Sequence, residues 1–255
     1  YTVRKEVGRA GIKRKTDEPD GPKEDLGMAI TTFAAIDVGS FDLQLAIYEI
    51  SQKNGIRCLD HMRKTAGVGT DTYMEGKISS HLIDAMCTIL KGFCQVMEEY
   101  QVKDCRAYAT SALREAGNSQ IVLDQIRVRT GIEVKVLSNS EQRFLCYKAI
   151  AVKENEFQSI IKKGTAIVDV GSGSTQLSLF DKDALVTTQY LKLGALRIKE
   201  TLGHLDYDRV NYRTLIRELV DSDIDTFRKM FLKDRDIKNI IATGLCALYL
   251  NRKGG

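Results

Sequence analysis

Residues 168–177 read VDVGSGSTQL, and a closely similar stretch, IDVGSFDLQL, occupies residues 36–45. In each stretch a short apolar run reaches an aspartate, Asp37 or Asp169, and a Gly-Ser pair follows two residues later. An alternation of polar and apolar residues then begins, which is typical of a second strand after a tight turn. The two copies lie 132 residues apart (37 to 169), so the sequence predicts two α/β halves of similar fold.

Strand and helix patterns alternate on either side of these two stretches. The helical spacing of apolar residues is clearest in 79–101, and Gly131 is expected to end a helix that Asn118 or Ser119 begins. A further helix is expected behind a Ser140 cap. The predicted order is strands at 33–38, 43–50 and within 55–67, helix 79–101, strand 104–112, helix 118–131, strand 132–138, helix 140–152, strands 164–171, 175–181 and 184–194, helix 206–232 and strand 237–244.

The chain divides into three parts. Residues 1–27 hold both prolines, carry many charges and have few large apolar residues, so they are expected to be a disordered leader or an addition to the natural protein that starts near Met28. Residues 28–160 form the first predicted half and residues 161–255 the second. The second half ends soon after strand 237–244, so we expect it to be truncated and the chain to be a fragment.

Composition excludes several functional classes. The net charge of +4 over 255 residues is too small to predict binding to a nucleic acid duplex. The six cysteines form no C-x-x-C pair and the three histidines lack metal-site spacing, which argues for reduced thiols, a cytoplasmic location and no zinc site. The sequence has no apolar run of the roughly 18–20 residues that a bilayer requires, so no membrane partner is expected.

The repeated stretches have the composition of a phosphate-binding site. Glycine in a tight turn leaves room for a ligand to approach, and converging backbone N–H groups bind anions. Two like-folded halves would place both turns on opposite walls of one cleft. There Asp37 and Asp169 could hold Mg²⁺ that offsets polyphosphate charge. The predicted phosphate-binding residues of the turns are Gly39, Ser40, Gly171, Ser172, Gly173, Ser174 and Thr175.

The chain resembles the exopolyphosphatase/guanosine pentaphosphate phosphohydrolase (Ppx/GppA) family. This similarity spans roughly residues 33–245 and rests on AAIDVGSFDLQLAI, YATSALREAGN, IEVKVLSNSEQRFL, AIVDVGSGSTQLSLF and LKLGALRIKE, which stand in the family's order. It implies the actin-like ATPase superfold, which is ribonuclease H-like and has two similar βββαβαβα halves beside a cleft. It also implies phosphate contacts by Arg114 and, more weakly, by Arg197, and pairing into homodimers.

The departures from the family pattern fall on acidic positions. Gln142 stands where the resemblance places the base that activates water, and Gln176 replaces a second carboxylate. Glutamine cannot take a proton, although it can orient a water molecule. Glu141 is adjacent, but on a helix it would point about 100° away, so it could replace the base only if the register shifted. The candidate catalytic residues are therefore Gln142, Glu141 and Gln176.

Three functions follow from these observations. The first is a magnesium-dependent hydrolase of inorganic polyphosphate or guanosine pentaphosphate. The second is a weakened relative that binds polyphosphate or a guanosine nucleotide as a sensor or regulator, because losing two carboxylates favours anion binding over hydrolysis. The third, less favoured, is an ATPase or kinase of the same superfold. The sequence leaves the choice between polyphosphate and guanosine ligands open.

Overall fold

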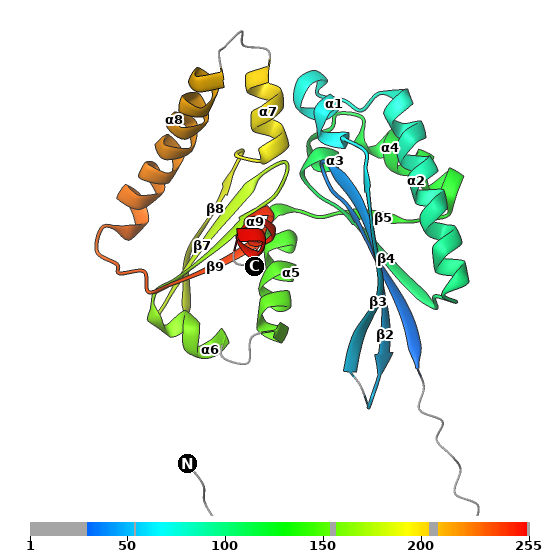
Figure 1. Ribbon diagram of the computed structural model, residues 1–255, viewed down its shortest axis with the longest axis horizontal. Coiled ribbons are helices and arrows are strands. Elements are labelled where there is room, and N and C mark those ends of the chain that lie inside the picture. Colours follow the sequence, from blue (N-terminus) through cyan, green and yellow to red (C-terminus); the bar gives the residue numbers. More distant parts are fainter. Residues whose placement is uncertain (1–29, 54, 154–156, 204–208, 254–255) are drawn as a thin grey trace, which may run out of the picture.

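The structure, a computed structural model, contains two mixed β-sheets with helices packed around them (Figure 1). It describes residues 30–53, 55–153, 157–203 and 209–253. The predicted leader, residues 1–27, lies outside these described residues. No described helix is both long and apolar enough to cross a membrane.

The first half is built on a five-stranded sheet in the order β3-β2-β1-β4-β5. Strand β1 runs antiparallel to β2 and parallel to β4. The elements are β1 (Thr31–Val38), β2 (Asp42–Ser51), β3 (Gly55–Thr65), α1 (Val68–Glu75), α2 (Ser80–Glu99), β4 (Asp104–Ala109), α3 (Ser111–Glu115), α4 (Ser119–Thr130) and β5 (Val134–Val136).

The second half repeats this topology on a sheet in the order β8-β7-β6-β9. Strand β6 runs antiparallel to β7 and parallel to β9, as β1 does to β2 and β4. Within the described residues no strand pairs with the free edge of β9. The elements are α5 (Asn139–Lys153), α6 (Phe157–Ile160), a 3₁₀ turn (Ile161–Lys163), β6 (Thr165–Val170), β7 (Thr175–Asp181), β8 (Ala184–Leu191), α7 (Ala195–Gly203), α8 (Arg209–Phe227), a π-helical turn (Arg228–Leu232), β9 (Asn239–Gly244) and α9 (Leu245–Lys253).

Sequence alternation explains which face of the first sheet is buried. In β2 the residues Leu43, Leu45 and Ile47 are fully buried, while the residues between them, Gln44 and Ala46, point to the other face. Helices α2 and α4 cover the buried face, and Phe93 and Ile126 are among the side chains they contribute to one continuous core. The same alternation in β1 buries Ile36 and Val38 and leaves Asp37 on the opposite face.

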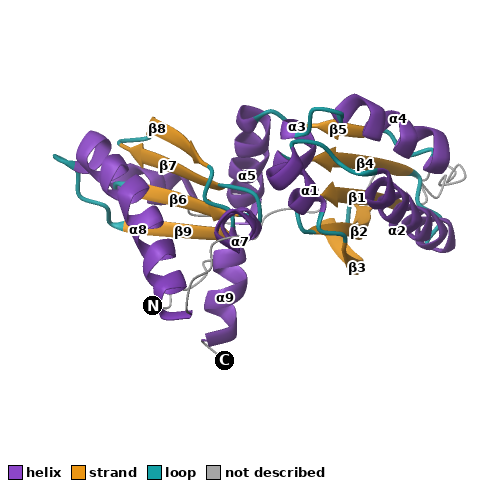
Figure 2. Ribbon diagram, turned by 90° about the horizontal axis from the view of Figure 1, so that it is seen from above, coloured by secondary structure: helices purple, strands orange, loops and turns teal. Residues whose placement is uncertain are grey.

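Helix α5 packs on the second sheet, although it precedes β6 in the chain. Its residues Cys146, Tyr147 and Ile150 join the cluster that contains Ile167 of β6 and Phe180 of β7. Helix α8 covers the opposite face of that sheet, together with the turn after it. The predicted boundary at residue 160 follows α5, whereas the sheet on which α5 packs lies after that boundary. Figure 2 shows α5 and α7 between the two sheets.

The structure corrects several predicted elements. Strand 104–112 ends at Ala109, because Ser111 already begins α3. The expected Ser140 cap is wrong: Ser138 caps α5, with its Oγ accepting from the Glu141 amide at 3.2 Å. The short helices α1, α3 and α7 are not among the predicted elements. Gly131 does end α4 in the left-handed conformation, as expected.

Candidate functional site

The two repeated turns line one cavity of about 400 Å³ between the halves. This confirms the expectation that the turns lie on opposite walls of a common site. The first turn and its strands supply one wall, the second turn supplies the other, and α3 and α5 contribute a few residues. The lining residues are Asp37, Gly39, Ser40, Phe41, Asp42, Gln44, Arg63, Thr110, Ser111, Gln142, Asp169, Val170, Gly171, Ser172, Gly173, Ser174, Gly244 and Leu245.

The two turns have the same hydrogen bond. The Gly39 amide donates to the carbonyl of Asp42 at 3.1 Å, and the Gly171 amide donates to the carbonyl of Ser174 at 2.8 Å. A Cβ atom on Gly39 would lie 2.9 Å from the Asp42 carbonyl, so a side chain there would collide with the backbone of its own turn. The repeat therefore encodes the same local geometry in both halves.

Asp37 and Asp169 occupy equivalent places at the ends of β1 and β6. Asp37 lies opposite Gln44 in the strand register, and Asp169 lies opposite Gln176. Although water reaches Asp37, the cleft walls surround its carboxylate and restrict solvation. This burial, followed by the charge of Asp169, raises the pKa of Asp37 to about 6.

The Asp169 carboxylate has a fixed orientation. Its Oδ1 accepts a hydrogen bond from the Thr243 hydroxyl of β9 at 2.9 Å. Burial raises the pKa of Asp169, and the hydrogen bond from Thr243 opposes that rise. A side chain at Gly244 would lie 2.9 Å from the same Oδ1, so the glycine keeps the space beside the carboxylate open.

Negative charge dominates the cavity. Among the described lining residues there are three aspartates, Asp37, Asp42 and Asp169, and one cation, Arg63. The Arg63 guanidinium lies 3.6 Å from an Asp42 oxygen and donates to Gln44 Oε1 at 3.2 Å. A polyanion entering this cavity would meet net repulsion unless a cation accompanied it.

The donor set fits a hard divalent cation. Asp37 and Asp169 offer carboxylate oxygens from opposite walls, and their mutual repulsion is the kind that a bound cation relieves. Mg²⁺ characteristically binds through one or two carboxylates while substrate phosphates and water complete its shell. No group of three or more His, Cys, Asp or Glu side chains that could hold a metal ion occurs among the described residues.

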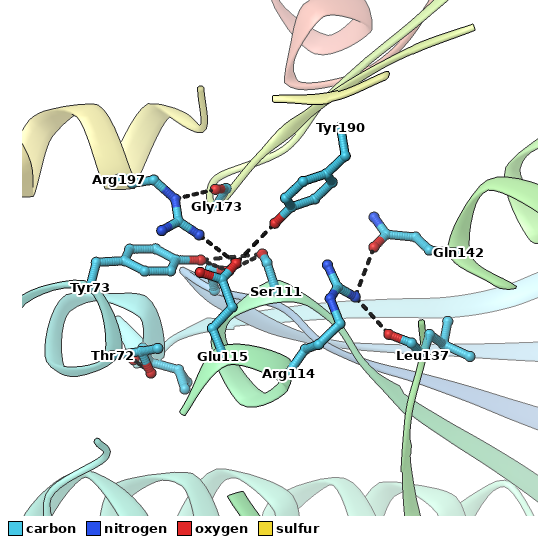
Figure 3. A network of polar contacts seen from close by, with 12 residues as sticks. Thr72, Tyr73, Ser111, Arg114, Glu115, Leu137, Gln142, Gly173, Tyr190 and Arg197 are labelled. Atoms are coloured by element: carbon cyan, nitrogen blue, oxygen red, sulfur yellow. Dashed lines mark hydrogen bonds and ion pairs between the residues drawn. The ribbon is translucent and has the colours of Figure 1, made fainter. Parts of the chain in front are cut away.

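Gln142 lines the cavity, but its acceptor oxygen is engaged. Arg114 Nη1 donates to Gln142 Oε1 at 3.4 Å and to the Leu137 carbonyl at 2.6 Å (Figure 3). A guanidinium only donates, so the amide must turn its oxygen toward Arg114 and leave its NH₂ group for other contacts. Arg114 itself does not line the cavity, and its buried Nη2 has no hydrogen-bond partner among the described residues.

Glu141 points away from the cavity, as the helical geometry predicts. Its Oε2 accepts from the Ser138 amide at 2.9 Å, and its Oε1 accepts from Lys135 at 2.7 Å. With the Ser138 side chain this makes a capping box at the start of α5. The Lys135 contact and then the Ser138 backbone contact lower the pKa of Glu141 to about 2. The Glu141 carboxylate therefore caps the N-terminus of α5.

Gln176 is buried behind the second turn and does not line the cavity. Neither its Oε1 nor its Nε2 has a hydrogen-bond partner among the described residues. Thr175, the preceding residue, also turns inward and donates to the Leu193 carbonyl at 2.5 Å. Gln176, a predicted catalytic residue, and Thr175, a predicted phosphate-binding residue, therefore both lie outside the cavity lining.

Arg197 also lies outside the cavity lining. Its guanidinium pairs with Glu115 at 2.7 Å and donates through Nε to the Gly173 carbonyl at 2.7 Å (Figure 3). The side chain predicted to contact phosphate therefore contacts protein groups outside the cavity. Sequence reasoning missed its partners Glu115 and Tyr73, and it also missed the cavity residues Arg63, Thr110 and Ser111.

The sequence of this chain is similar to those of known phosphatases. The exopolyphosphatase 1 of Mycobacterium leprae is 26% identical over 191 residues, covering 74% of this chain and 55% of the relative. A bifunctional 3-dehydroquinate synthase/phosphatase of Fusobacterium nucleatum is 21% identical over 210 residues, covering 77% of this chain and 31% of the relative. This chain thus spans about a third to a half of the length of these two relatives.

A solved exopolyphosphatase structure from Cytophaga hutchinsonii shares the fold, with a TM-score of 0.71 at 21% identity over 88% of this chain and 72% of that one. The fold is the α/β actin-like ATPase fold with two mixed sheets. The Ppx/GppA phosphatase family matches residues 46–245, most of the described chain. This chain therefore belongs to the Ppx/GppA phosphatase family.

Proposed function

We propose that this chain binds the end of a phosphoanhydride chain, together with a divalent cation, and hydrolyses the terminal anhydride. The observation that carries this proposal is the placement of Asp37 and Asp169 on opposite walls of one cavity, each beside a Gly-Ser turn. Inorganic polyphosphate and the 5′-triphosphate of guanosine pentaphosphate both offer this chemistry.

The cation requirement follows from the charge of the site. Among the residues that the structure describes, three aspartates and one arginine line the cavity, so a polyphosphate needs positive charge to enter. Asp37 and Asp169 would hold the cation, which would neutralise phosphate charge and polarise the anhydride. The amides and hydroxyls of the two turns would orient the phosphates.

The test is phosphate release with Mg²⁺ from long-chain polyphosphate and, separately, from guanosine pentaphosphate. We expect release from at least one substrate by the unaltered chain and loss of release in Asp169→Ala. Release that survives in Asp169→Ala would contradict the proposal, since the assigned carboxylate would then be dispensable. The two substrates distinguish an exopolyphosphatase from a guanosine pentaphosphate hydrolase.

A second function, binding without turnover, is favoured by the position of Gln142. Its oxygen accepts from Arg114, which leaves the NH₂ group as the part that could face a phosphate. A donor at this point would bind an anion but would not take a proton from water. Binding of magnesium tripolyphosphate, detected by calorimetric titration, together with no release of phosphate would support this alternative over the hydrolase.

A further inference from the structure

A network of side chains joins the two halves beside the cavity (Figure 3). Arg197 of α7, in the second half, contacts Glu115 of α3, in the first half, with 2.7 Å between Nη2 and Oε1. Their side chains are 12% and 25% exposed, so the pair is largely shielded from solvent. The same Glu115 oxygen accepts from the Tyr190 hydroxyl of β8 at 2.9 Å. Glu115 is thus held by two donors from the other half.

Tyr73 connects this ion pair to the first phosphate-binding turn. The central guanidinium carbon of Arg197 lies 3.8 Å from the centroid of the Tyr73 ring, which is close cation–π contact. The Tyr73 hydroxyl bonds to Ser40 Oγ at 2.7 Å and donates to Ser111 Oγ at 3.2 Å. Ser40 belongs to the first turn, so Tyr73 links Arg197 to that turn.

Arg197 also holds the second turn. Its Nε donates to the Gly173 carbonyl at 2.7 Å, and the amide of the neighbouring Leu196 donates to the Ser172 carbonyl at 2.9 Å. A Cβ atom on Gly173 would overlap the hydroxyls of Tyr73, Ser111 and Ser40. The tip of the second turn therefore sits directly against the hydroxyl cluster of the first half, and only glycine fits there.

We propose that Glu115, Arg197 and Tyr73 form a latch between the halves, and that they are positioning residues for the phosphate ligand. The latch sets the spacing of the two turns through the sequence of contacts Ser40–Tyr73–Arg197–Gly173. None of the three latch residues lines the cavity, so their effect on a ligand is indirect. Any consequence for ligand binding rests on the proposed function, whereas the latch itself is a property of the free protein.

The coupling has a direct thermodynamic consequence. A ligand that touches both turns binds best when the turns are held at the right distance, so closing the latch and binding the ligand favour each other. Losing the latch should therefore weaken binding even though no direct ligand contact is lost. It should also let the halves separate in the absence of ligand.

The experiment compares Glu115→Gln with the unaltered chain. Glutamine keeps the shape and one acceptor oxygen but removes the charge that opposes Arg197, and Glu115→Ala removes the acceptor as well. Because Glu115→Ala leaves a shielded arginine unpaired and risks unfolding, Glu115→Gln is the variant that decides. The matched control is Asp84→Asn, which alters the 2.6 Å pair between Asp84 and Arg129, both within the first half.

Two measurements are made on each protein. Hydrogen exchange of the free protein is followed by mass spectrometry, and magnesium tripolyphosphate binding is followed by calorimetry. For Glu115→Gln we expect faster exchange confined to peptides covering residues 66–76, 111–116 and 171–197, with unchanged exchange in the α2 and α4 core. We expect tripolyphosphate affinity to fall about tenfold. The control should change neither measurement.

The outcomes separate the latch from the proposed function. Unchanged exchange at the interface in Glu115→Gln, or exchange that rises equally throughout the chain, would overturn the latch. Faster exchange confined to the interface peptides, with unchanged affinity for tripolyphosphate, would overturn the proposal that the latch residues position the ligand. If the unaltered chain does not bind tripolyphosphate at all, the proposed function fails, while the exchange measurement still decides whether the latch exists.

Discussion

Asp37 and Asp169 line one cavity from two different sheets, and the charge of Asp169 helps to raise the pKa of Asp37 to about 6. The internal repeat accounts for this relationship, since each aspartate follows a strand at the same position before the same turn. Two carboxylates that repel each other in a partly desolvated site are held there by the fold. A ligand that brings positive charge between them would relieve that repulsion.

The first prediction concerns the pH dependence of divalent cation binding. Because Asp37 is protonated below its raised pKa, we expect Mn²⁺ or Mg²⁺ affinity to fall as the pH drops through about 6. Isothermal titration between pH 5 and pH 8 measures this. Asp37→Asn should bind the cation more weakly, and its affinity should change less with pH in that range. Affinity that stays constant from pH 8 to pH 5 would show that Asp37 is not a ligand.

The same raised pKa affects stability in the absence of metal. The native state holds its Asp37 proton up to about pH 6, whereas the unfolded state loses it near 3.8. This contribution to stability is therefore fully present below 3.8 and is lost as the pH rises through about 6. Urea denaturation of the unaltered chain against Asp37→Asn should show the unaltered chain losing stability relative to the variant across that window.

The second prediction is a gain of hydrolysis in Gln142→Glu. A carboxylate could accept from Arg114 with one oxygen and still receive a proton from water with the other. General base catalysis contributes about 10²–10⁴-fold, so we expect phosphate release to rise by about a hundredfold or more. Gln120→Glu, at an exposed position of α4, controls for the added charge. Equal rates of phosphate release in Gln142→Glu and the unaltered chain would show that a missing general base does not limit hydrolysis.

The turns and their aspartates could be predicted from the sequence because they are local features. A strand, a Gly-Ser turn and a second strand follow from residue order alone, and the repeat then places Asp37 opposite Asp169. The direction of Glu141 was also predictable, because helical geometry separates it from Gln142. Its partners, Lys135 and Ser138, do not follow from helical geometry alone.

The latch could not be predicted in the same way. Tyr73, Glu115 and Arg197 lie on α1, α3 and α7, three short helices that are not among the predicted elements, and they are far apart in the chain. Their meeting depends on how the halves pack together, which no local pattern records. The resemblance therefore implies a phosphate contact for Arg197 but gives no sign of its contacts with Glu115 and the Gly173 carbonyl.

The third prediction concerns the buried amide of Gln176. Both of its polar atoms lack partners among the described residues, and a buried unsatisfied polar group costs about 1–3 kcal/mol. Methionine has a similar shape without those atoms, so Gln176→Met should raise the free energy of unfolding by about 1–2 kcal/mol. Gln176→Glu should lower it, because a carboxylate would be buried without a partner. Urea denaturation at pH 7 measures both, and a loss of stability in Gln176→Met would show that the amide has a favourable contact.

The last prediction concerns Arg63, the one cation among the described residues that line the cavity. From its position beside Asp42 and Gln44, its guanidinium would contact a phosphate oxygen bound in the cavity. The side chain is exposed, so its contact is screened, and Arg63→Ala should lower magnesium tripolyphosphate affinity only about two- to fivefold. Arg57→Ala is the matched control, since Arg57 lies on the same strand and pairs with Glu49 outside the cavity. Calorimetry at low and moderate salt should show the difference between the two variants shrinking as salt rises. Equal affinities for the two variants at low salt would remove Arg63 from the binding site.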